Sequence, residues 1–254
     1  MKRIIREMEK TLSDVQREVK ATIKELVALC ENFRGMGKAF TFASSGTDAQ
    51  VNALLLELSN RIQEDFDDRI QFAIEESEDD DNDGILAYVG REYNGMTSQE
   101  RIDGHVSRLK YLVEGFIAIG FSSGFSATKI RTQLYILTSN PDAMGYFTDA
   151  RKAGGFKASY ITDGDINSRK GWQRDIIKSI SGVGATMIAD AFHYGCIDRY
   201  KRSGAIGYGV QRNSTYDCPD CDDVCAVIHP FSEIVVPVHP NCCCSTFPVY
   251  AEDL

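Results

Sequence analysis

Apolar residues recur at alternating steps of three and four between residues 4 and 33, a spacing that places them along one side of a helix. About four heptads fit this stretch, which predicts a helix roughly 45 Å long at about 1.5 Å per residue. Such a stripe packs against a partner helix, either in the same chain or in another copy. The stripe consists of Met8, Leu12, Val15, Val19, Leu26, Leu29 and Phe33, with Thr22 as its polar member.

A second stripe with the same rhythm follows a polar loop at residues 44–47 and continues to about residue 76. Two long helices joined by a short connection form an antiparallel hairpin. We therefore predict a helical hairpin at the N-terminal end of the fold, with the first helix ending at residues 34–37. The apolar positions of the second helix are Val51, Leu54, Leu55, Leu58, Ile62, Phe66, Ile70 and Ile74.

The middle of the chain predicts further helices. Thr97 and Glu100 have the spacing of a capping box, and the helix that they begin has a buried face as far as residue 121. Ser126 is expected to cap a helix over residues 128–137. Helices over residues 172–180 and 185–201 are separated by a predicted glycine hinge at residues 182–184, and Gly204 closes the last one. Residues 141–170 are less regular and suggest a short helix near 143–152 and a strand near 158–162.

Alternating apolar positions predict strands over residues 206–212, 233–238 and 247–250. Together these strands can form a small antiparallel sheet. The predicted fold is therefore α+β and mainly helical, with a long N-terminal hairpin followed by helices and a small sheet. We place a helical hairpin and an acidic loop in residues 1–95, and an α+β module in residues 96–254.

Six of the eight cysteines lie between residues 218 and 244. A C-x-x-C pair there is followed, after 17 residues, by an H-x-x-C pair. Each pair can chelate one ion from a tight turn, and four ligands of the Cys/His type suit tetrahedral zinc. We therefore predict a structural zinc site near the C-terminus. The candidate ligands are Cys218, Cys221, His239, Cys242 and Cys244, of which Cys244 is the main alternative to Cys242.

Two other interpretations apply to the same cysteines. Free cysteine packs as a small buried hydrophobe, and in an oxidising compartment cysteines form disulfides. The sequence begins with an amphipathic pattern and not with the apolar core of a secretory signal. We therefore expect synthesis in a reducing cytoplasm, which favours a metal over disulfides. Cys225, Cys243 and His229 are expected to lie outside the ligand set.

The composition is that of a globular protein, with 43% hydrophobic and 26% charged residues. The formal net charge is −9, which gives the chain no global electrostatic reason to bind DNA. From residue 171 onward the chain has six Lys or Arg and ten Asp or Glu, a balance of −4. No apolar run approaches the roughly 18 residues that a membrane helix needs.

An acidic run at residues 75–84 resembles the start of a calcium loop. Asp79, Asp81, Asp83 and Gly84 occupy the first, third, fifth and sixth positions of an EF-hand loop. The twelfth position is Gly90, where a bidentate glutamate is required. A solvated acidic loop is therefore the favoured interpretation.

Catalytic motifs are absent from the sequence. It contains no phosphate-binding loop, dinucleotide fingerprint, nucleophile elbow or H-E-x-x-H zinc motif. His193 and Cys196 are three residues apart on a predicted helix, but no oxyanion hole is evident beside them. A closed set of four ligands argues for a structural ion, so we predict no enzymatic activity.

The ending C-P-x-C … P-x-H-P-N-C-x-C … P, preceded by a long helix and a short strand, resembles the C-terminal module of phage Mu F-like minor head proteins. The resemblance covers roughly the last third of the chain, and a weaker similarity begins at Gly124. In this family the ending is usually Cys-Arg-Cys, where Cys243 stands here, and the helix commonly carries Arg-Thr-Glu where this chain has residues 190–193. About residues 139–171 have the character of an insertion.

The resemblance implies a structural minor head protein in the virion of a tailed phage. It would be made in the host cytoplasm, assemble in several copies with the portal protein or the major capsid protein, and act in head assembly or in DNA packaging or delivery. The alternative is a zinc-dependent nucleic-acid-binding protein. An enzyme or a toxin-related module is the third possibility, motivated only by the additional cysteines and histidines.

Overall fold

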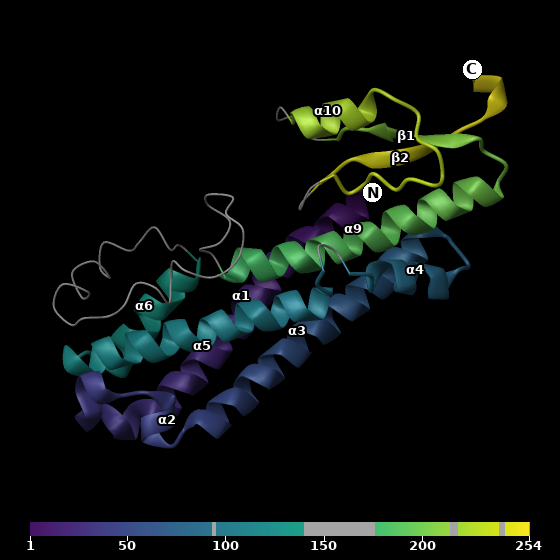
Figure 1. The fold of residues 1–254 in the computed structure, drawn as a ribbon. Coiled ribbons are helices and arrows are strands. Elements are labelled where there is room, and N and C mark those ends of the chain that lie inside the picture. The colour runs from purple at the N-terminus through teal and green to yellow at the C-terminus, as the bar shows by residue number, and fades with distance from the viewer. Residues whose placement is uncertain (93–94, 140–175, 214–217, 239–241, 254) are drawn as a thin grey trace. The chain divides into compact units, whose positions relative to one another are not determined.

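The computed structural model describes residues 1–92, 95–139, 176–213, 218–238 and 242–253 (Figure 1). The described chain is mainly helical and has one small antiparallel sheet, which confirms the predicted fold class. The helix and strand expected within residues 141–170 lie outside the described residues, as does most of the expected insertion at 139–171. None of the described helices combines the length and the apolar character needed to span a membrane.

The described residues form two compact units. The first contains Met1–Leu12, Glu64–Ser98 and Gly182–Leu254, and the second contains Ser13–Gln63 and Gln99–Ser181. Both units therefore include segments from either side of residue 95. The boundary expected between residues 95 and 96 stays a prediction.

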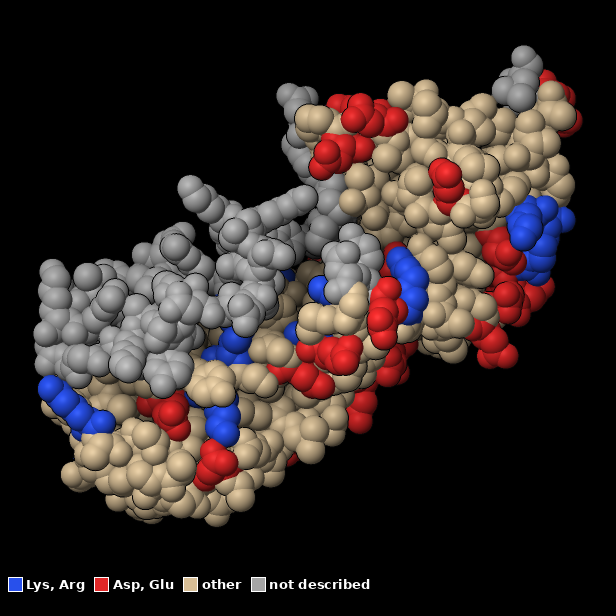
Figure 2. Space-filling model, viewed as in Figure 1, with Lys and Arg blue, Asp and Glu red and all other residues tan. Residues whose placement is uncertain are grey.

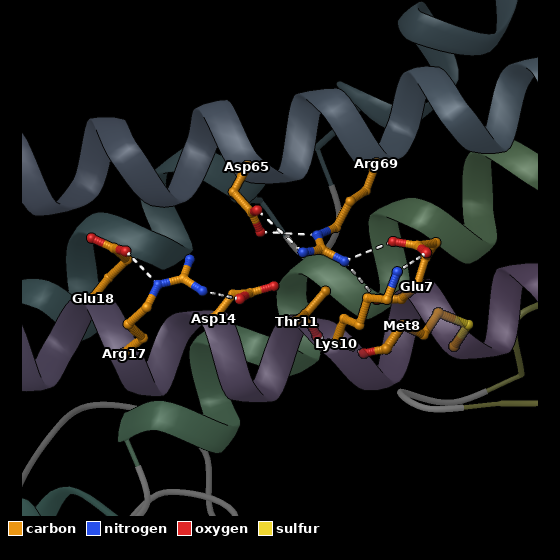
Figure 3. A network of polar contacts seen from close by, with 9 residues as sticks. All are labelled: Glu7, Met8, Lys10, Thr11, Asp14, Arg17, Glu18, Asp65 and Arg69. Carbon is orange, nitrogen blue, oxygen red and sulfur yellow. Dashed lines mark hydrogen bonds and ion pairs between the residues drawn. The ribbon is translucent and has the colours of Figure 1, made fainter.

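The two long N-terminal helices form as predicted. Helix α1 spans Lys2–Cys30, and helix α3 spans Asp48–Ser77. Within the first unit, Arg69 of α3 contacts Asp65 at 2.9 Å and reaches Glu7 of α1 at 2.8 Å (Figure 3). Only 11% of the Arg69 side chain is exposed, so this pairing is better shielded from solvent than a surface ion pair and fixes the register of the two helices.

The predicted stripe on α1 is buried at most positions, and two residues exchange roles. Leu12 is 42% exposed, whereas Thr11 beside it is 1% exposed and its hydroxyl donates to the carbonyl of Met8 at 2.7 Å. In the second unit, Thr22 is also buried and accepts a hydrogen bond from Arg61 of α3 at 3.2 Å. Both buried hydroxyls are therefore satisfied within their own unit, and the partner of α1 is a helix of the same chain.

The second unit continues with short turns and two helices. A 3-10 segment, η1, spans Glu31–Ala39, and helix α2 spans Phe42–Ser45. Helix α5 spans Ser98–Ser122, and its buried residues recur from Ile102 to Phe121, as the predicted buried face requires. Helix α6 spans Ala127–Ser139, and the Ser126 hydroxyl accepts from the backbone N–H of Lys129 as expected of a cap.

Helix α9 spans Ile176–Arg202 without interruption, so the predicted hinge at residues 182–184 is wrong. Gly184 does not bend the helix but allows a neighbouring side chain to pack closely against it. A Cβ atom placed at Gly184 would lie 2.4 Å from the Phe66 ring of α3, and one at Gly195 would lie 2.2 Å from the Ser77 hydroxyl. These glycines let α9 and α3 approach closely in the first unit. Gly204 has φ +86 and ends the helix as predicted.

The acidic run is anchored to α9 and is less solvated than the sequence suggested. Helix α4, which spans Asn82–Val89, begins here, and Asp81 caps it by accepting from the Gly84 N–H at 3.0 Å. The Asp79 side chain is buried and pairs with Arg202. Of the residues at calcium-loop positions, Asp79 is thus paired with a guanidinium and Asp81 caps the N-terminus of α4.

The sheet consists of strand β1, Gly207–Gln211, and strand β2, Ser245–Val249, in antiparallel register. Tyr208 lies opposite Pro248 and exchanges both backbone hydrogen bonds with His229 on the other side of β1. Pro248 and Thr246 therefore direct their backbone polar groups away from β1. The Thr246 carbonyl accepts from the Tyr200 hydroxyl at 3.0 Å.

The strand predicted over residues 233–238 does not form. The backbone groups that would pair with a neighbouring strand bind the buried side chain of Tyr208 instead. The Tyr208 hydroxyl donates to the Glu233 carbonyl at 2.6 Å and accepts from the Val235 N–H at 3.1 Å. This segment is irregular and packs on the first strand through side chains. The other two predicted strands correspond to β1 and β2.

Candidate metal centre

Three cysteine sulfurs meet beside the sheet. The ligand atoms of Cys221, Cys242 and Cys244 all lie within 4.8 Å of one another, and each of these residues is at most 2% exposed. A zinc ion with Zn–S bonds of about 2.3 Å holds its sulfurs about 3.8 Å apart, so this spacing is compatible with a shared metal ion. The sequence predicted all three as candidate ligands.

Two separate segments bring these sulfurs together. Helix α10 spans Pro219–Cys225 and carries Cys221, with Cys218 at its N-cap position and proline as its first residue. Cys242 and Cys244 stand on the segment that leads into β2, and both contribute their sulfurs to the group. The predicted turn around Cys218 and Cys221 is therefore the first turn of a helix.

The thiols form part of a small hydrophobic core. The cluster joins them to side chains of α9, β1 and the irregular segment before the second cysteine group: Ile197, Tyr208, Val210 and Val236. All eight cysteines lie in the described residues and are thiols, not disulfides. The structure therefore has no disulfides among these cysteines. It is compatible both with packing of free thiols and with metal binding.

Burial changes the acidity of these thiols. It raises the pKa of Cys221 to about 12, with Cys218 contributing in the same direction, and it also raises the pKa of Cys244. A metal ion takes the deprotonated thiolate, so binding to this group must release protons. The group offers a metal the soft sulfur ligands that zinc accepts.

The other predicted ligands lie at the margin of the cluster or outside the described residues. The Cys218 side chain contacts that of Cys221. His239 lies outside the described residues. Cys243 is half-buried between two buried neighbours, and burial raises the pKa of its thiol.

His229 has a structural contact of its own. Its Nε2 atom lies 2.8 Å from the Val224 carbonyl, and because a carbonyl can only accept, Nε2 carries the proton. The ring also packs against Tyr208, with centroids 5.4 Å apart. His229 therefore ties the end of α10 to β1.

Cys225, which was predicted to lie outside the ligand set, stands at the edge of the group. Its thiol makes a side-chain contact with Cys244, and burial raises its pKa. The spacing of Cys218, Cys221 and Cys225, at steps of three and four, is the signal that could have shown one helical face. It was missed because the first pair was interpreted as a turn.

His193 and Cys196 are both buried on α9. Burial lowers the pKa of His193 to about 4, and neither of its ring nitrogens has a hydrogen-bond partner among the described residues. Burial raises the pKa of Cys196 to about 11, and its thiol contacts the Tyr200 side chain. A protonated, buried thiol is a poor nucleophile.

Charge near the cysteines is negative. Asp220 and Asp222 lie in the first turn of α10, and Figure 2 shows acidic side chains over this helix. Asp222 pairs with Arg212, and Asp223 is exposed. This surface disfavours the phosphate backbone of a nucleic acid.

Comparison with protein-family models, with curated proteins and with solved structures found no match to this chain.

Proposed function

We propose that Cys221, Cys242 and Cys244, with a fourth ligand from Cys218 or His239, hold a structural zinc ion. The observation that carries this proposal is the meeting of three buried sulfurs from two segments of the chain. A sheet of two five-residue strands buries too little surface to be stable alone. An ion bound between α10 and the segment before β2 would cross-link the sheet to its covering helix.

The burial of the sulfurs favours a structural ion over a catalytic one. A catalytic zinc keeps one position open to water or substrate, whereas a structural zinc is closed by four protein ligands. Cys242 is fully buried, and Cys221 and Cys244 are 2% exposed. The zinc would therefore contribute to folding and not to chemistry on a substrate.

We further propose that the chain is a minor head protein in the virion of a tailed phage. The support is the resemblance of its ending to Mu F-like minor head proteins, together with the clustering of Cys221, Cys242 and Cys244, three of the cysteines that carry this resemblance. Its partners would be the portal protein or the major capsid protein, with several copies in each particle. The net charge of −9 favours contact with protein over direct contact with DNA.

The zinc proposal is tested by the metal content of the purified protein. We expect about one zinc per chain and its loss in Cys242→Ser, because that sulfur is a member of the central group. Cys243→Ser is the matched control, since the neighbouring thiol lies outside the group and its removal should leave the metal in place. Protein without zinc, or equal loss in both variants, would contradict the proposal.

The virion proposal predicts that portal and major capsid genes lie beside the gene of this chain, and it is tested by co-expressing their products with this protein. The protein should sediment with procapsids in a sucrose gradient and remain with them after a salt wash. Protein that stays at the top of the gradient would refute this role. Retardation of DNA in a gel at low salt, lost at moderate salt, would instead favour the nucleic-acid-binding alternative.

A further inference from the structure

Helix α10 directs three cysteines toward one side. Cys218 stands at its N-cap, Cys221 in its first turn and Cys225 at its last residue, with steps of three and four between them. Residues at this spacing lie on one helix face, one above the other. The face is turned toward Cys242 and Cys244, since Cys221 belongs to the same group as these two sulfurs.

The two outer cysteines of α10 contact different members of the central group. The Cys218 side chain contacts Cys221, and the Cys225 side chain contacts Cys244. Two further cysteines therefore flank the group of three sulfurs, one at each end of α10, although neither belongs to the set whose ligand atoms all lie within 4.8 Å of one another.

We propose that the metal centre is bound by sulfur alone and that Cys218 and Cys225 are interchangeable as the fourth ligand. This inference rests on the zinc site proposed above and extends it to a residue outside the predicted ligand set. Tetrahedral zinc takes four ligands, whereas the structure offers five sulfurs, so one outer sulfur remains when the other binds. The imidazole of His239 is not needed to complete the set.

An all-sulfur set with a reserve ligand has a chemical consequence. Thiolates are soft ligands and favour zinc and other thiophilic ions over magnesium or calcium. Because either end of α10 can supply the fourth sulfur, loss of one outer thiol should leave the ion bound. The centre would thus tolerate change at either of these two positions but not at the central three.

The test compares the zinc content of Cys218→Ser, Cys225→Ser and the double variant. Each single variant should retain about one zinc per chain, and the double variant should lose it. Loss in Cys218→Ser alone would make Cys218 the sole fourth ligand and overturn the proposal. Retention in the double variant, with loss in His239→Ala, would overturn it in favour of an imidazole. A wild-type protein without zinc would contradict the zinc site itself, which is a separate outcome.

Cobalt substitution keeps the inference testable if the double variant does not fold. Cobalt(II) in a tetrahedral thiolate site gives a sulfur-to-metal charge-transfer band whose intensity follows the number of bound thiolates. Wild type and both single variants should have equal intensity, because four sulfurs bind in each case. Lower intensity in either single variant would contradict the exchange of Cys218 and Cys225. Cys243→Ser again serves as the control and should leave the spectrum unchanged.

Discussion

Replacement of His193 by phenylalanine should remove part of the acid sensitivity of this protein. His193 lies on α9 with 0% of its surface exposed, and its two ring nitrogens have no hydrogen-bond partner among the described residues. Burial lowers its pKa from 6.5 to about 4, and the amino terminus of the chain acts in the same direction. The imidazole is therefore held neutral in the folded protein.

The sign of the effect follows from proton binding. Between about pH 6.5 and pH 4 the unfolded chain takes up a proton at His193 that the folded protein does not. The free energy of unfolding that depends on a neutral His193 is fully present above pH 6.5. It is lost as the pH falls toward 4, because the unfolded chain gains the proton first. At about 1.4 kcal/mol per pKa unit, the full loss is about 3 kcal/mol, and about 2 kcal/mol of it has occurred by pH 5.

The assay is urea unfolding followed by far-UV circular dichroism at pH 5, 6 and 7. The free energy of unfolding of His193→Phe relative to wild type should rise by about 2 kcal/mol from pH 7 to pH 5. His193→Gln is the control, because it keeps a polar side chain without a titrating group. It should show the same pH trend at lower overall stability, since its amide stays unsatisfied. An identical pH dependence in wild type and both variants would refute the reasoning.

Three further predictions concern packing, a buried hydroxyl and the acidic run. Gly184→Ala places a methyl group 2.4 Å from the Phe66 ring and should cost about 1–3 kcal/mol by chemical denaturation. Gly104→Ala on α5 is its control, because no atom lies within 4 Å of the added methyl group. This variant should gain about 0.5–1 kcal/mol in free energy of unfolding. Equal effects of the two substitutions would contradict close packing at Gly184. Tyr208→Phe should lower the free energy of unfolding by about 1–3 kcal/mol, because two backbone groups lose their partner; unchanged stability would show that water replaces the hydroxyl. Calcium should leave the melting temperature unchanged, because Arg202 pairs with Asp79; a rise that Asp81→Asn abolishes would contradict this.

Periodicity was sufficient to predict the long helices α1, α3 and α5. The stripes on α1, α3 and α5 are long, and a long stripe determines a buried face independently of tertiary detail. The same approach failed at residues 182–184, because a glycine that breaks a helix and a glycine that admits a neighbouring ring look alike in sequence. Phe66, the ring in question, lies more than a hundred residues earlier in the chain.

Two local predictions failed for related reasons. The apolar alternation at residues 233–238 is real, but the Tyr208 hydroxyl takes the backbone groups that a strand would have used. The acidic run looked solvated because its counter-charge comes from α9, over a hundred residues away. In both cases the deciding partner is distant in sequence, and nothing within the segment itself indicates that partner.

The metal centre was predictable in part. The spacing of the cysteines identified Cys221, Cys242 and Cys244, which the structure brings together. It did not identify the helical face of α10, because Cys218 and Cys221 were interpreted as a chelating turn and not as the start of a helix. Cys225 was therefore set aside, although its distance from Cys221 is one helical turn.

The outer flank of β2 has a consequence for how molecules of this protein behave when crowded. An open strand edge invites the same edge of a second molecule to add to it, and such stacking can continue into an aggregate. Here Pro248 offers no amide hydrogen on that flank, and the Thr246 carbonyl already accepts from Tyr200. This flank of β2 is therefore poorly suited to adding a strand from a second molecule.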